Sequence, residues 1–184
     1  SGALVDVLGM RVLHALSGLG YIVGVLLVIF APFPAGPVDS IFGTTGTLVL
    51  YTGFLIMGLS QGLVEGVINP LATALYPDQK THRMNVLHAW WPGGMIAGGL
   101  VAYAITRVMG LDTAGIPASL ATLGWQIKLA VILVPAAGFA VVLRGQRFPA
   151  TERVAAGVST REMFREALRP MFLVWFACMW LTAA

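Results

Sequence analysis

The sequence predicts an all-α, polytopic membrane protein, and three observations lead to this fold class. Hydrophobic residues make up 58% of the 184 residues and charged residues only 10%, with a mean hydropathy of +0.85, a composition that soluble domains do not have. Several apolar runs reach roughly 20 residues, the length with which an α-helix crosses a bilayer. Lys and Arg are also concentrated in alternate connecting segments, as in multi-span proteins.

Apolar runs mark four complete spans and a fifth, shorter one. An α-helix rises 1.5 Å per residue, so roughly 20 residues cover about 30 Å of hydrocarbon. The second run is longer than this, and we expect its helix to tilt or to protrude. The last run is too short for a full crossing, and we expect it to be truncated. The five spans are Val12 to Ala31, Leu48 to Tyr76, Val86 to Val108, Leu123 to Leu143 and Pro170 to Ala184.

Positive charge divides the connecting segments into two groups. Segments 32–47 and 109–122 contain no Lys or Arg and are rich in Gly and Pro, so we expect short external connectors. The other segments carry most of the cations, and the positive-inside rule places them in the cytoplasm. The predicted cytoplasmic cations are Arg11, Lys80, Arg83, Arg144, Arg147, Arg153, Arg161, Arg165 and Arg169.

The stretch 145–169 differs from the other connections because it is both polar and rich in arginine. It ends in STREMFREALRP, where Ser159 and Glu162 fit the S-x-x-E capping box and Pro170 follows the expected helix. We therefore expect a short amphipathic helix that lies on the cytoplasmic membrane surface.

Glu65 is the only formally charged residue in the second span. A carboxylate near the hydrocarbon core costs about 2.5 to 3.5 kcal/mol, so we expect it to face a cavity or a pathway. Gln61 and Asn69 lie four residues before and after it, which places three polar side chains in one row that we interpret as the lining of a polar cavity. An adjacent face carries glycines at the same interval, where we expect another helix to pack closely. These glycines are Gly58, Gly62 and Gly66.

The third span carries a second polar row near its start. Asn85, His88 and Trp91 recur every three residues and stay near one helix face for two turns, so we expect them to lie opposite Glu65. For His88 the alternative is an interfacial histidine bonded to a nearby carbonyl. We interpret Trp90 as a packing or interfacial residue, whereas for Trp91 this role and stacking on a ligand ring both remain open.

Several classes of function lack their sequence signals. HExxH, CxxC, Walker and GxSxG motifs are absent, as is a phosphate-binding loop, so we expect no metal, nucleotide or flavin cofactor and no enzymatic activity. A single cysteine, Cys178, excludes an intrachain disulfide. The net charge of +3 is not gathered on a basic face with interleaved aromatics, so nucleic acid is not an expected partner.

The N-terminal segment SGALVDVLGMRV resembles the G-x-L-a-D-x-x-G-r-[KR] signature that major facilitator superfamily transporters carry between their second and third helices. The glycines permit a tight cytoplasmic turn, and the aspartate can accept hydrogen bonds from a neighbouring helix N-terminus or an arginine. Met10 departs from the signature, because it stands where the family prefers arginine. The matching residues are Gly2, Leu4, Asp6, Gly9 and Arg11.

A second segment, VEGVINPLATALYPDQKTHRMNVLHAWWPGG, resembles the fourth and fifth helices of the fucose/glucose-galactose proton symporter branch of the same superfamily. By this resemblance Glu65 lines a central cavity and takes part in sugar binding coupled to protons. Bulky residues from Trp90 to Pro92 stand where the sugar transporters more often have smaller polar side chains, which leaves the substrate open. The matching residues are Glu65, Asn69, Pro70, Asn85 and His88.

The resemblance implies a partial major facilitator fold, with helices equivalent to the third to sixth and the ends of the second and seventh. Residues 1–144 would belong to the N-terminal transmembrane helix bundle, 145–169 to the central cytoplasmic loop, and 170–184 to the start of the C-terminal bundle. We therefore expect the chain to be a fragment of a twelve-helix protein.

The resemblance also implies a secondary active transporter in the cytoplasmic (inner) membrane. It would move a small polar solute, with a sugar as the first expectation, by alternating access with proton symport. The expected partners are the solute, protons and the lipid bilayer, and a monomer is favoured. Alternatives stay open: a uniporter that uses Glu65 only to accept hydrogen bonds, a nucleoside transporter of the same fold, or a non-transporting membrane subunit.

Overall fold

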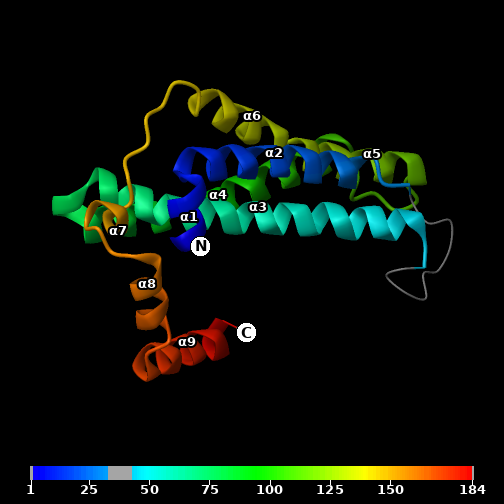
Figure 1. Ribbon diagram of the computed structural model, residues 1–184. Helices are drawn as coiled ribbons and strands as arrows, with labels where there is room; N and C mark the ends of the chain where they lie inside the picture. The colour runs from blue at the N-terminus through cyan, green and yellow to red at the C-terminus, as the bar shows by residue number, and fades with distance from the viewer. Residues whose placement is uncertain (1, 33–42, 184) are drawn as a thin grey trace.

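Every regular element in the described part of the chain is a helix (Figure 1). The computed structural model describes residues 2–32 and 43–183, so most of the expected external segment 32–47 lies outside the described residues. Helices α2 and α3 pack side by side in opposite directions, and α5 and α6 lie along α2. The helices are α1 (Gly2–Leu8), α2 (Met10–Ile29), α3 (Thr45–Leu75), the 3-10 turn η1 (Pro77–Gln79), α4 (Lys80–Val108), α5 (Ala118–Ala130), α6 (Leu133–Val142), α7 (Glu152–Ala155), α8 (Thr160–Ala167) and α9 (Pro170–Ala183).

Three segments of the described chain are long and apolar enough to cross a membrane: α2, α3, and α5 taken together with α6. The sequence predicts a further complete span from Val86 to Val108, which is not among these three segments. Those residues do form most of α4, which is long enough at 29 residues. Its glycines, tryptophans and proline nevertheless keep it outside the set of three apolar helices.

The interruption between α5 and α6 is explained by Pro135. A proline has no N–H, so the carbonyl four residues earlier, on Val131, loses its usual helical donor. The N–H of Val134 donates to this carbonyl instead, over 3.2 Å. This tighter bond reaches only three residues back, so regular α-helix ends at Ala130 and begins again at Leu133.

Helices α2 and α3 cross at glycines that bring their backbones into contact. A Cβ atom on Gly24 would lie 2.6 Å from Cγ of Met57 and 2.9 Å from the carbonyl oxygen of Gly53. A Cβ atom on Gly53 would lie 2.6 Å from Cγ2 of Val28. Such distances are too short for carbon atoms, so the crossing requires glycine at both positions.

The glycines that the sequence predicts for helix packing are not the ones at this crossing. Apart from the adjacent residues and nearby backbone of α3 itself, no described atom lies within 4 Å of a Cβ atom placed on Gly58 or Gly62. The reason is geometric, because α2 packs against the face of α3 that carries Gly53 and Ser60, and Gly58 and Gly62 lie on a different face. The four-residue spacing alone does not tell which face a neighbouring helix selects.

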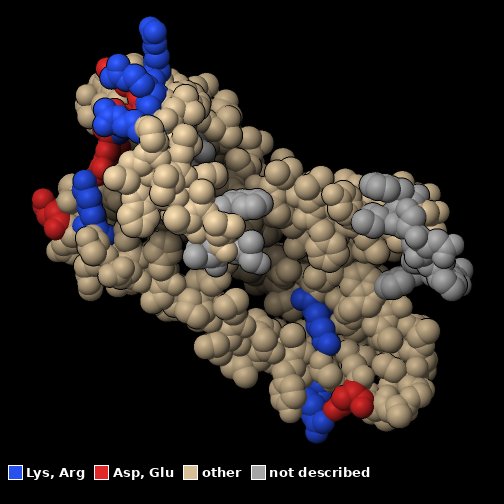
Figure 2. Space-filling view, turned by 90° about the horizontal axis from the view of Figure 1, so that it is seen from below, with Lys and Arg blue, Asp and Glu red and all other residues tan. Residues whose placement is uncertain are grey.

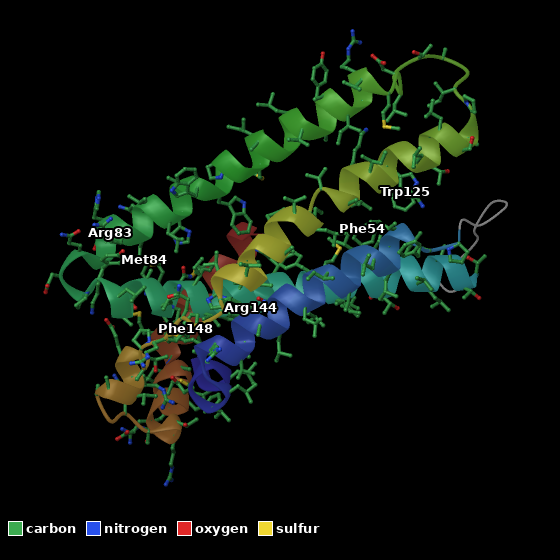
Figure 3. All side chains as sticks on the ribbon, turned by 90° about the horizontal axis from the view of Figure 1, so that it is seen from above. Phe54, Arg83, Met84, Trp125, Arg144 and Phe148 are labelled. Carbon is green, nitrogen blue, oxygen red and sulfur yellow. The ribbon has the colours of Figure 1, made fainter. Side chains whose placement is uncertain are left out.

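A small apolar core closes one end of the bundle, where α1, the start of α2 and the C-terminal half of α3 meet. Its four members are at most 3% exposed, and three partly buried side chains pack against them. One of these three, Phe148, follows α6 and lies at the end of the bundle where Arg83 and Arg144 are labelled (Figure 3). The core therefore ties the connection after α6 to the bundle. Its members are Val5, Met10, Leu13 and Val67, with Leu63, Leu71 and Phe148 packed against them.

Most of the charged side chains visible in Figure 2 gather at one end of the bundle, and a few others lie apart from this group. The start of α2, the end of α3, the start of α4 and the end of α6 share one end (Figure 1). The predicted cytoplasmic cations lie in the first turns of α2 and α4 or in the connection from α6 to α9. The two other cations are Arg107, which pairs with Asp112, and Lys128. This is the distribution that the charge pattern of the sequence predicts.

The connection from α6 to α9 contains the short helix that the sequence predicts. At the start of α8 the Ser159 hydroxyl accepts from the Glu162 N–H over 3.2 Å, and the Glu162 carboxylate accepts from the Ser159 N–H over 2.9 Å. The capping box is thus confirmed, and Pro170 begins α9. Helix α8 runs across the direction of α2 and α3, whereas α9 turns back along it (Figure 1).

The capping box makes the start of α8 sensitive to acid. Hydrogen bonds from the backbone N–H and hydroxyl of Ser159 hold the pKa of Glu162 below its ordinary value of 4.5. Because the folded pKa is lowered, this stabilisation is complete above pH 4.5 and disappears as the pH falls through the lowered value. We expect amide hydrogen exchange in α8 to accelerate in that acidic range. Glu162→Gln should abolish the pH step and Glu166→Gln should keep it; equal behaviour of the two variants would contradict the assignment.

Candidate functional site

The polar row on α3 opens into a groove between α3 and α4. The groove has a volume of about 410 Å³. Figure 3 shows α4 diverging from α3 with increasing distance from the end that carries Arg83 and Met84. The groove brings together five of the six ligand-contacting residues that the sequence predicts. Its lining is Gln61, Val64, Glu65, Ile68, Asn69, Leu87, His88, Trp90 and Trp91.

Two residues of α4 differ from their expected places. Asn85 is exposed and does not line the groove. Each three-residue step on a helix falls about 60° short of a full turn, so Asn85 has rotated away from the face that carries His88. Trp90, which the sequence assigns to packing or to the membrane interface, lines the groove beside Trp91 and keeps 74% of its surface exposed. Both indoles are therefore available to a ligand in the groove.

Glu65 ends a chain of hydrogen bonds that crosses from α2 to α3. The Gln61 amide nitrogen donates to a carboxylate oxygen of Glu65 over 2.9 Å. The amide oxygen of the same Gln61 accepts from the Tyr21 hydroxyl. Because Tyr21 occupies the oxygen of the amide, the nitrogen of the amide is directed to Glu65. Tyr21 thus fixes the orientation of Gln61, and Gln61 holds the carboxylate in the groove.

The sequence analysis did not identify Tyr21 as part of the site, although the spacing of polar residues in α2 indicates it. His14, Ser17 and Tyr21 are spaced by three and four residues along the otherwise apolar α2, so they share a helix face. Ser17 and His14 are buried at 0% and 2% exposure, and the His14 ring contacts the ring of Phe139 edge-on at 5.2 Å. This row faces the interior of the bundle and ends at Gln61.

Asn69 occupies a second polar position on α3, next to a proline inside the helix. Its side-chain oxygen is buried and has no hydrogen-bond partner in the described residues. Asn69 lines both the groove and a second cavity of about 340 Å³, which contains Asp6 and Arg153. The amide oxygen can therefore accept a hydrogen bond from a ligand or a water molecule that enters either space.

No family model, curated protein or solved structure matches the chain. Within residues 2–32 and 43–183 there is also no cluster of three His, Cys, Asp or Glu side chains that could hold a metal ion. The chemistry of the groove is consequently that of one carboxylate, two amides, one imidazole and two indoles. These groups can accept and donate hydrogen bonds, stack on a ring and carry one exchangeable proton.

Asp6 forms a second polar centre at the charged end of the bundle. Its carboxylate accepts from Nε of Arg153 over 2.5 Å and from the hydroxyl of Thr151, the N-cap of α7. An arginine is thus one of the donors to Asp6, as the sequence allows, and the second donor is a side-chain hydroxyl rather than a backbone N–H of a helix N-terminus. Gly9, at φ 82°, makes the expected tight turn between α1 and α2, while Arg11 is exposed.

The Asp6 centre attaches the connection after α6 to the bundle. The Asp6 side chain is only 5% exposed and that of Arg153 19%. One residue earlier, Glu152 pairs with Lys80 of α4 over 2.6 Å, but both of these side chains are nearly half exposed. Two neighbouring residues of α7 therefore bind the bundle through one buried and one exposed ion pair.

Replacing Asp6 is expected to destabilise the protein far more than replacing Glu152. Asp6→Asn leaves the Arg153 guanidinium without its carboxylate in a mostly buried place, which costs about 2 to 3 kcal/mol. Glu152→Gln breaks an exposed pair that contributes less than about 1 kcal/mol. In thermal unfolding of the full-length gene product, we expect Asp6→Asn to lower Tm by roughly 5 °C and Glu152→Gln by less than about 2 °C. Equal shifts would contradict the assigned burial.

Proposed function

We propose that the chain forms the solute-binding part of a major facilitator transporter, which carries a sugar into the cell together with protons. The observation that carries this proposal is the hydrogen-bonded series from Tyr21 through Gln61 to Glu65, which ends in an open groove beside two tryptophans. A carboxylate held in this way within an apolar helix is characteristic of a pathway for substrate or protons.

The size and chemistry of the groove suit a sugar ring. Its volume of about 410 Å³ lies within the range of small-molecule sites, roughly 300 to 1,000 Å³. The oxygens of Glu65 and Asn69 can accept hydrogen bonds from hydroxyl groups, and His88 can donate or accept one. The indole faces of Trp90 and Trp91 can stack on the C–H face of a pyranose. A polyhydroxylated ring would satisfy both kinds of group at once.

The position of Glu65 along α3 supports a membrane pathway. Ten residues separate Glu65 from the end of α3 at Leu75, or roughly 15 Å at 1.5 Å per residue. This is about half of the hydrocarbon thickness. With the Arg-rich end in the cytoplasm of an inner-membrane protein, Glu65 would lie near the middle of the bilayer, the depth at which transporters bind their substrates.

In the proposed mechanism Glu65 takes a proton from the outside and releases it inside. Protonation removes the charge of the carboxylate, and the loaded cavity then closes on one side and opens on the other. A proton that enters down 100 mV supplies about 2.3 kcal/mol, enough for roughly a 50-fold gradient of the solute at one-to-one coupling. One titrating carboxylate is sufficient for such coupling.

Uptake assays of the full-length gene product test the proposal. Labelled sugars and nucleosides are offered to cells that lack their own hexose carriers, with and without a protonophore. We expect protonophore-sensitive uptake of a sugar. Sugar uptake that is insensitive to the protonophore would favour a uniporter. Uptake of nucleosides but not of sugars would identify a nucleoside, rather than a sugar, as the substrate. Absence of any uptake by folded, membrane-inserted protein would contradict the transporter assignment.

A further inference from the structure

Helix α8 carries three rows of side chains that lie next to one another around its axis. Successive residues on a helix are rotated by about 100°, so residues four apart fall into one row. The arginine row lies between an apolar row and an acidic row. The three rows are Phe164 with Leu168, Arg161 with Arg165, and Glu162 with Glu166.

The apolar row of α8 is not covered by the described part of the protein. Phe164 and Leu168 keep 54% and 69% of their surface exposed, and the main helix contact of α8 is with α9. A helix with a strongly charged side and two large exposed apolar side chains on the other is typical of helices that lie in a membrane interface.

The placement of α8 in the fold agrees with this chemistry. The chain enters the connection from the apolar helix α6 and leaves it in the apolar helix α9, both of which run along the bundle, while α8 runs across them (Figure 1). This is also the end at which the larger group of charged side chains gathers (Figure 2). Helices on both sides therefore hold α8 at the level where the apolar body of the bundle ends.

Both acidic side chains of α8 have a hydrogen-bond or ion-pair partner, whereas the arginine row has only the electrostatic attraction between Arg165 and Glu162. Glu162 caps the helix through Ser159, and Glu166 pairs with Arg169 over 2.8 Å. The described residues provide no ion pair for Arg161 or Arg165. Two unpaired guanidinium groups one turn apart, next to apolar side chains, are complementary to a phosphate group that is attached to acyl chains.

We propose that α8 binds anionic phospholipids of the cytoplasmic leaflet, with Arg161 and Arg165 on the headgroup phosphates and Phe164 and Leu168 among the acyl chains. The apolar row distinguishes a phospholipid from free phosphate, because free phosphate has no acyl chains that could contact Phe164 and Leu168. The inference concerns a surface distant from Glu65 and does not depend on which solute the groove takes.

Lipid titration of the purified full-length gene product tests this surface. Fluorescent phosphatidylglycerol and phosphatidylcholine are titrated against the wild type, Arg161→Gln/Arg165→Gln and Arg144→Gln/Arg147→Gln. The last variant is the matched control, because it removes two cations from the same connection outside α8. Each arginine near an anionic lipid surface is worth about fivefold in affinity, so we expect the α8 variant to bind phosphatidylglycerol about 30-fold more weakly. The control should bind within a few-fold of wild type.

Two further variants separate the surface from general charge attraction and from misfolding. Phe164→Ser/Leu168→Ser should also weaken binding, and Arg161→Lys/Arg165→Lys should keep most of it, because lysine retains the positive charge. Three results would overturn the proposal: equal losses in both arginine-to-glutamine variants, equal binding of the two lipids by wild type, or displacement of phosphatidylglycerol by an equal concentration of inorganic phosphate.

Discussion

Glu65→Gln is expected to abolish accumulation of the solute while leaving its equilibration across the membrane. Glutamine has the size of glutamate and can still bond to Gln61 and to hydroxyl groups, but it cannot take up or release a proton. Accumulation against a gradient should therefore fall from as much as about 50-fold at 100 mV to about one. The measurement is the steady-state ratio of labelled sugar inside and outside energised cells.

A control variant removes a carboxylate elsewhere in the protein. Asp112→Asn removes a carboxylate from the exposed pair with Arg107, outside the groove. It should accumulate the sugar as wild type does. Accumulation that persists in Glu65→Gln, or that is lost equally in Asp112→Asn, would remove Glu65 from the coupling mechanism.

Gly24→Ala is expected to separate α2 from α3. The added methyl group would lie 2.6 Å from Cγ of Met57 and 2.9 Å from the backbone oxygen of Gly53. Met57 can move its side chain, but the backbone of α3 cannot yield without opening the crossing. Overpacking of this kind costs about 1 to 3 kcal/mol, and a larger residue such as leucine should cost more. The measurement is thermal unfolding of the full-length gene product.

Gly58→Ala, in α3, is expected to have the opposite effect on stability. A methyl group there would meet no described atom within 4 Å apart from the adjacent residues and nearby backbone of α3, and alanine favours a helix over glycine by up to about 1 kcal/mol. We expect this variant to unfold at or slightly above the wild-type temperature. A loss of stability at Gly58 as large as that at Gly24 would mean that another helix covers this face in the intact protein.

The groove was predictable from sequence because its signal is local. A single carboxylate within an apolar run, with amides four residues away on both sides, needs no knowledge of the fold to be noticed. His88 and Trp91 follow within the next predicted span, and the short turn at Pro77 to Gln79 returns α4 along α3.

Residues that depend on tertiary contacts could not be predicted in the same way. Tyr21 bonds to a residue 40 positions away, and a tyrosine in an apolar helix has many other uses. For Asp6 the type of partner follows from its charge, but the identity of Arg153, 147 positions away, does not. Gly53 lies outside the four-residue row of glycines on α3, and only the path of α2 selects it.

Proton movement on addition of solute tests the central claim most directly. Sugar is added to de-energised cells or proteoliposomes in weak buffer, and the external pH is recorded for wild type and Glu65→Gln. Proton symport through Glu65 predicts that the medium becomes alkaline as sugar enters the wild type, with no change in the variant. Sugar entry without any pH change in wild type, or an equal pH change in Glu65→Gln, would contradict the proposed role of the carboxylate.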